Sequence, residues 1–136
     1  MRHKLDRIVR LAAALTVAVA LGSGPIAAQV TGTDFYLGYL KTFGTATSID
    51  QLLPFMSKQR VDQVKGTPAD ERKMMFEMIK EMGAKDVKVV KETPTATGAT
   101  LETTGSDPSG GAMKGTVTLV KEAGAWKIDK ESWSSN

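Results

Sequence analysis

The sequence predicts an α+β fold in which helices come first and an antiparallel sheet follows. Apolar residues recur at helical spacing up to about residue 83, and from Val87 onward they alternate with polar residues, as in strands with one buried face. Turn-forming residues separate the alternating segments, so consecutive hairpins are the natural connection. We therefore expect three N-terminal helices packed on one face of a four-stranded antiparallel meander.

The first helix is expected from Asp34 to Thr45. Its apolar face would carry Tyr36, Tyr39, Leu40 and Phe43, which follow the i, i+3, i+4, i+7 spacing. These aromatic side chains are expected to pack in the core.

The second helical segment contains a proline and is expected to be broken. Ser48 and Gln51 have the spacing of a capping box, which favours a helix start at Ser48. Pro54 fits a first turn better than a helix interior, so a new helix should begin near Leu53 and carry Met56, Val61 and Val64.

The third helix is expected from Pro68 to Met82. Thr67 would be its N-cap, and Gly83 stands where a left-handed C-cap residue belongs. One stripe of this helix carries Met75, Met78, Ile79 and Met82, and an amphipathic stripe of this kind usually faces the core.

Four alternating segments follow, and the last one contains an irregular spacing. Their apolar positions include Val87 and Val89, then Ala99 and Leu101, then Met113, Val117 and Leu119, then Trp126 and Ile128. The spacing from Ile128 to Trp133 is odd, so the two side chains share a face only if a bulge intervenes. We expect either a bulge near Lys130 or a frayed C-terminal end.

The first 28 residues have the order of a secretory signal peptide. A basic start is followed by an apolar run from Leu11 to Leu21 and by small residues up to Ala28. The apolar run is short for a membrane-spanning helix, so an uncleaved anchor is the weaker alternative. We expect residues 1–28 to be removed and residues 29–136 to form a single domain, periplasmic or extracellular and soluble after cleavage.

The basic character of the chain comes from the expected signal peptide. Four of the 18 basic residues and one of the 15 acidic residues precede Gln29, which leaves 14 of each in the remainder. A domain without net charge has no electrostatic preference for phosphate backbones or anionic lipids. We therefore expect neither a nucleic-acid partner nor a membrane partner after cleavage.

The order of the elements, together with two sequence stretches, resembles the nuclear transport factor 2-like superfamily, in particular its small exported bacterial members. The stretches are residues 49–57, IDQLLPFMS, and residues 120–128, VKEAGAWKI. The resemblance implies a cone in which a curved sheet wraps a long helix and leaves a pocket at its open end. Some members of the superfamily are isomerases or dehydratases and others only bind ligands, so the resemblance does not decide the function.

The residue types present favour binding over catalysis. The chain has no cysteine and its one histidine is His3, so histidine- or cysteine-dependent catalysis and the usual zinc ligands are excluded from the mature domain. We expect a non-catalytic domain without a cofactor or metal that binds a small apolar molecule or a partner protein in its pocket. The residues expected to line that pocket are Tyr36, Tyr39, Met78, Met113 and Trp126.

Three alternatives remain open at this stage. A small isomerase or dehydratase would need a tyrosine and a carboxylate in an apolar pocket, but Glu102 and Asp129 have the parity of solvent-facing positions. A homodimer could form through the outer face of the sheet. The repeat of Met74, Met78 and Met82 could bind copper(I), although a core role is commoner for such a stripe.

Overall fold

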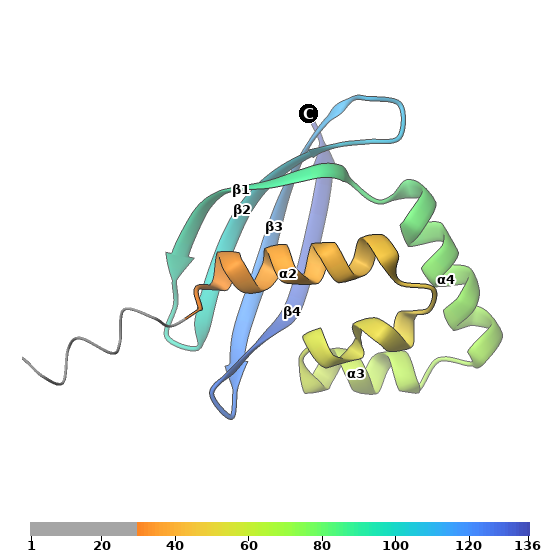
Figure 1. Ribbon diagram of the computed structural model, residues 1–136, viewed down its shortest axis with the longest axis horizontal. Helices are drawn as coiled ribbons and strands as arrows, with labels where there is room; N and C mark the ends of the chain where they lie inside the picture. Colours follow the sequence, from red (N-terminus) through yellow and green to blue (C-terminus); the bar gives the residue numbers. More distant parts are fainter. Residues whose placement is uncertain (1–29) are drawn as a thin grey trace, which may run out of the picture. The chain divides into compact units, whose positions relative to one another are not determined.

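The computed structural model describes residues 30–136, and the predicted signal peptide lies outside these residues. Four helical segments precede four strands (Figure 1). They are α2 (Gly32–Thr45), the 3₁₀ helix η2 (Ile49–Phe55), α3 (Lys58–Lys65), α4 (Ala69–Met82), β1 (Lys85–Pro94), β2 (Gly98–Ser106), β3 (Ala112–Glu122) and β4 (Ala125–Ser135). In this part of the chain no helix is both long and apolar enough to cross a membrane.

The α+β class and the order of helices before sheet agree with the sequence, but the predicted arrangement of three helices is wrong. The segment expected to be one broken helix forms two separate ones, η2 and α3. Pro54 lies inside η2, where it has no N–H to donate and prevents an α-helix from continuing. Ser57 then starts α3, because its hydroxyl accepts a hydrogen bond from the Arg60 N–H.

Three predicted helix caps also differ from the structure. Pro68, and not Thr67, is the N-cap of α4, which begins at Ala69. The Ser48 side chain makes no capping hydrogen bond, and the side-chain Oε1 of Gln51 accepts from the Thr47 N–H instead. Gly83 ends α4 in an extended conformation and not a left-handed one. A glycine is nevertheless required there, because a Cβ atom would clash with the Ile79 carbonyl oxygen.

The strands form one antiparallel sheet in the order β1-β2-β3-β4. Ala123 and Gly124 both have positive φ angles and join β3 to β4 in a tight hairpin. In β4 the register shifts by one residue, since Thr118 pairs with Lys130 whereas Leu119 pairs with Ile128. The bulge predicted near Lys130 is therefore confirmed, and Asp129 is the extra residue.

The core lies between α2 and the inner face of the sheet. In Figure 1, α2 runs across the strands, and its buried Tyr36 and Tyr39 side chains belong to the same apolar cluster as the strand residues. Leu101, Val117, Leu119 and Ile128 are fully buried on the sheet side. The alternation seen in the sequence thus reflects one buried face of the sheet.

Two glutamates of the sheet accept hydrogen bonds from the N-termini of α2 and α3. Glu92 of β1 accepts hydrogen bonds from the backbone N–H groups of Gly32 and Thr33 at the start of α2, at 3.3 and 2.6 Å, and from the Thr33 hydroxyl at 2.5 Å. Glu122 of β3 accepts from the Lys58 N–H at the start of α3. A carboxylate at a helix N-terminus satisfies unpaired N–H groups and interacts favourably with the helix dipole.

Removal of the Glu92 carboxylate should therefore loosen α2 from the sheet. We expect Glu92→Ala to lower the free energy of unfolding by about 1–2 kcal/mol, which urea denaturation can measure. Glu102→Ala is the matched control, because Glu102 is an exposed glutamate on the neighbouring strand, and its effect should stay within about 0.5 kcal/mol. Equal losses in both variants would contradict this role of Glu92.

Candidate ligand pocket

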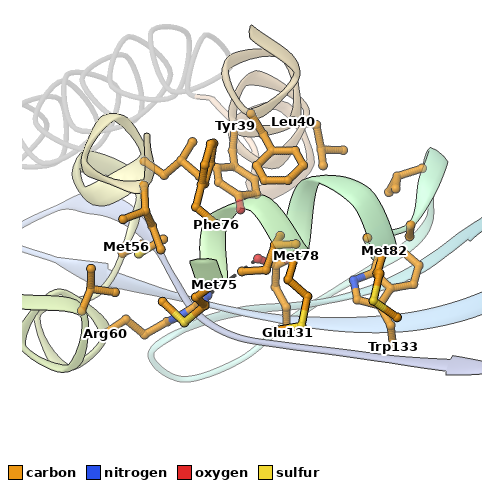
Figure 2. Close-up of a pocket in the computed structure, with 18 of the residues that line it drawn as sticks. Tyr39, Leu40, Met56, Arg60, Met75, Phe76, Met78, Met82, Glu131 and Trp133 are labelled. Atoms are coloured by element: carbon orange, nitrogen blue, oxygen red, sulfur yellow. Dashed lines mark ion pairs between the residues drawn. The ribbon is translucent and has the colours of Figure 1, made fainter. Parts of the chain in front are cut away.

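A pocket of about 570 Å³ opens between the helices and the C-terminal half of β4 (Figure 2). Most of its walls are apolar side chains from the helices α2, η2, α3 and α4 and from the strands β1 and β4. They are Tyr36, Tyr39, Leu40, Phe43, Ile49, Leu52, Met56, Val64, Met75, Phe76, Met78, Ile79, Met82, Ala84, Val87 and Trp133, joined by Arg60, Gln63, Thr67, Gly83 and Glu131. This size lies within the range of pockets that hold small organic molecules.

Met78, Ile79 and Met82 of the α4 stripe line the pocket and are exposed, so their predicted place in the core is wrong, whereas Met75 is half-buried and packs against the core cluster. Only Phe76 of this helix is buried, and its ring meets Phe43 of α2 edge to face at 6.4 Å. Met78 remains 54% exposed and Met82 67% exposed although both line the pocket. In Figure 2 the labelled methionines of α4 reach towards Glu131 and Trp133 of β4.

A small polar cluster lies within these apolar walls. The Tyr36 hydroxyl donates a hydrogen bond of 2.9 Å to Glu131 Oε2, and Arg60 Nη1 lies 3.7 Å from Glu131 Oε1. The dashed line in Figure 2 marks this ion pair. Arg60 Nη1 is buried and has no partner within hydrogen-bond distance in the described part of the chain, so it keeps an unused donor capacity.

Sequence reasoning missed Glu131, although the signal for it was present. Glu131 lies two residues before Trp133, and both line the pocket because the bulge at Asp129 reverses the parity of β4. The odd spacing between Ile128 and Trp133 predicted that bulge. Extending the same parity argument to residue 131 would have identified the carboxylate.

Burial raises the pKa of Tyr36 and of Tyr39 far above 10.0, the ordinary value for the phenol. The negative charge of Glu131 adds to the increase in both cases, and the hydrogen bond from Tyr36 to Glu131 strengthens it further. Tyr36 is completely buried, and its ring stacks on that of Tyr39 at 5.7 Å. In the folded protein both phenols therefore stay protonated at pH values above the ordinary pKa of 10.0.

A second, polar hollow of about 310 Å³ adjoins the same cluster. Gln59, Asp129 and Lys130 line it, and it shares Arg60, Gln63 and Glu131 with the apolar pocket. The Arg60–Glu131 ion pair thus stands between an apolar space on one side and a polar one on the other. A molecule in the apolar pocket would meet this pair as its polar contact.

Three of the five expected ligand-binding residues line the pocket, and two do not. Tyr36, Tyr39 and Met78 are in its walls, but Met113 and Trp126 are not. Trp126 precedes the bulge, packs against the core and has the Lys121 ammonium 4.6 Å from its ring centroid. Met113 lies near the start of β3, and the wall near that end of the sheet is formed by Trp133.

Among residues 30–136, no group of three or more histidine, aspartate or glutamate side chains could hold a metal ion. The carboxylates of the pocket region, Glu131 and Asp129, are engaged by protein groups: Ser57 donates a hydrogen bond of 2.8 Å to Asp129.

Comparison with known proteins overturns the resemblance to the nuclear transport factor 2-like superfamily. No family model matches the chain, and no curated protein matches it. A solved structure that does match is the solution structure of RPA3114, a SEC-C motif containing protein from Rhodopseudomonas palustris, with a TM-score of 0.49 and 14% identity over 79% of this chain and 84% of that one. The stretches behind the resemblance contain apolar and turn residues that many helix-and-meander folds require, so they do not define a family.

The buried tyrosines should give the protein a distinct alkaline titration. The folded protein holds both phenolic protons, whereas the unfolded chain loses them above pH 10.0, so stability should fall as the pH rises through that value. Above that pH, each tyrosine should lower the free energy of unfolding by about 1.4 kcal/mol per pH unit. Because these are the two tyrosines of the chain, tyrosinate absorbance should appear only together with loss of the folded circular dichroism signal.

Tyr39→Phe provides the internal comparison. It should remove about half of the tyrosine-linked slope of unfolding free energy against pH and leave the lysine contributions unchanged. Tyrosinate absorbance that develops while the protein is still folded would contradict the burial of these phenols.

Proposed function

We propose that this domain is non-catalytic and binds a small apolar molecule in the pocket between α2, η2, α4 and β4. The observation that carries the proposal is the exposure of Met78 and Met82 in the wall of an otherwise apolar pocket. Exposed apolar surface gathered in one concave place is typical of a binding site, and methionine adapts its shape to different ligands.

The energetics favour an occupant of this pocket. Complete burial of a methionine side chain is worth roughly 1.5–3 kcal/mol, and Met78 and Met82 each retain more than half of their exposure. A ligand that covers both would gain a large part of that energy. Binding by a protein segment at the same place remains an alternative, since an apolar side chain of a partner could fill the same space.

A second candidate function is the tyrosine- and carboxylate-dependent isomerase or dehydratase. The observation that favours it is the hydrogen bond between Tyr36 and Glu131 inside an apolar pocket, because this supplies the carboxylate that the sequence did not reveal. Recovery of a bound compound in a chemically altered form would support this candidate, and recovery of the unchanged compound would support binding alone.

The homodimer alternative receives no specific support from the outer face of the sheet. The exposed residues of that face include Glu102, Lys114, Thr116 and Lys130, and these are polar or charged. A dimer interface usually has an apolar centre.

We further propose that the domain works outside the cytoplasm. The support is the order of basic, apolar and small residues before Gln29. Intact-mass analysis of the protein from its own cells should give a chain that starts within a residue or two of Gln29. A variant with an arginine in the apolar run, Val17→Arg, should keep Met1, and a wild-type protein that also keeps Met1 would exclude cleavage.

Pocket binding can be tested on α4 with Nile red, an uncharged dye that fluoresces in apolar sites. Met78→Gln and Met82→Gln should each weaken dye binding about fivefold or more, because a polar amide replaces apolar wall. Met74→Gln is the matched control, since Met74 is 69% exposed on the same helix but does not line the pocket. Equal affinities in all three variants would rule out this site.

A further inference from the structure

The charges at the polar end of the pocket balance each other, and this restricts what can bind there. This step rests on the proposed function. Arg60 and Glu131 are the charged residues among the lining of the apolar pocket, and they form an ion pair with each other. A charged ligand group placed beside them would add an uncompensated charge in a partly buried site, which is costly.

The hydrogen-bonding groups of this cluster are not all used. Arg60 Nη1 is buried and lies 3.7 Å from the Glu131 carboxylate, which is too far for a hydrogen bond. The Arg60 side chain as a whole is 29% exposed and lines the pocket, so its guanidinium can donate to an oxygen that a ligand brings. The Tyr36 proton cannot serve this purpose, because it is already donated to Glu131.

We propose that the pocket binds amphiphiles with a hydrocarbon chain and an uncharged oxygen group, such as a hydroxyl or carbonyl. The chain lies along Met78 and Met82, and the oxygen accepts a hydrogen bond from Arg60. An uncharged oxygen satisfies the guanidinium without disturbing the charge balance with Glu131. Long-chain carboxylates and amines bind weakly, because either would add an unpaired charge beside the Arg60–Glu131 ion pair.

The volume of the pocket limits the size of such a ligand. The pocket volume of about 570 Å³ lies within the range of roughly 300–1,000 Å³ found for sites of small organic molecules. A chain of roughly ten carbons with its oxygen group therefore fits with space to spare.

A matched series of chains tests the proposal with the intact domain. Decanol, decanoate and decylamine differ only in the terminal group, and each can displace Nile red from the pocket at neutral pH. Decanol should bind at least tenfold more tightly than either charged compound. Equal affinities for the three compounds, or tighter binding of decanoate, would overturn the proposed ligand class.

Variants that remove one charge of the Arg60–Glu131 pair should each prefer a charged compound over decanol, and the preferred charge should differ between the two variants. Glu131→Gln leaves the Arg60 charge unpaired, so decanoate should become the tightest ligand of the three. Arg60→Gln leaves the Glu131 charge unpaired, so decylamine should take that place. Glu102→Gln removes an exposed carboxylate on the outer face of the sheet and should leave the order unchanged.

The outcomes separate this inference from the function on which it rests. If Nile red and all three chains fail to bind the folded wild-type protein, the pocket is not a ligand site and the proposed function fails. If they bind but the order of affinities is the same in wild type and both variants, binding stands and the selection by charge is wrong. Circular dichroism of each variant verifies its fold, and either variant alone suffices to detect the reversal.

Discussion

The bulge at Asp129 determines which side chains β4 presents to the helices, and the pocket depends on it. Ser57 fixes the bulge from the helical side: its hydroxyl donates to Asp129, and its backbone N–H donates to the Ile128 carbonyl at 2.9 Å. The same hydroxyl accepts from the Arg60 N–H at the first turn of α3. One serine thus couples the bulge to the helix that carries Arg60, and the bulge in turn directs Glu131 towards that arginine.

The helix α4 packs on α2 along one side, through Phe76 and Lys80. Phe76 packs against Phe43, and the Lys80 ammonium donates to the Phe43 carbonyl at the end of α2 while lying 5.0 Å from the Phe43 ring centroid. These contacts hold one side of the helix and leave its methionine stripe facing Trp133 across the pocket. Space of this kind costs the protein packing energy, and a bound apolar molecule would recover part of it.

The sequence predicted the elements well where a local pattern decides them, and poorly where distant packing does. The alternation of Val117 and Leu119 identified an inner sheet face, and the spacing of Ile128 and Trp133 identified the bulge, because both depend only on strand geometry. The burial of Phe76 in place of Met78 could not be inferred, since an amphipathic stripe does not say whether it faces a core or a cavity. The pairing of Arg60 with Glu131 joins residues far apart in the chain through a bulge and a capping serine, and no local pattern encodes that combination.

The geometry of the polar cluster favours binding over proton transfer. A general base needs a carboxylate that is free to take a proton from the substrate, within hydrogen-bond reach of it. Glu131 already accepts the Tyr36 proton on one oxygen, and its other oxygen lies 3.7 Å from the positive charge of Arg60, so taking a proton from a substrate would end this charge pairing. Arg60 also lines the pocket, and its guanidinium is a donor that cannot accept a proton. A pocket whose available polar group is a fixed cation, balanced by a neighbouring anion, is suited to hold an oxygen in place and not to remove a proton.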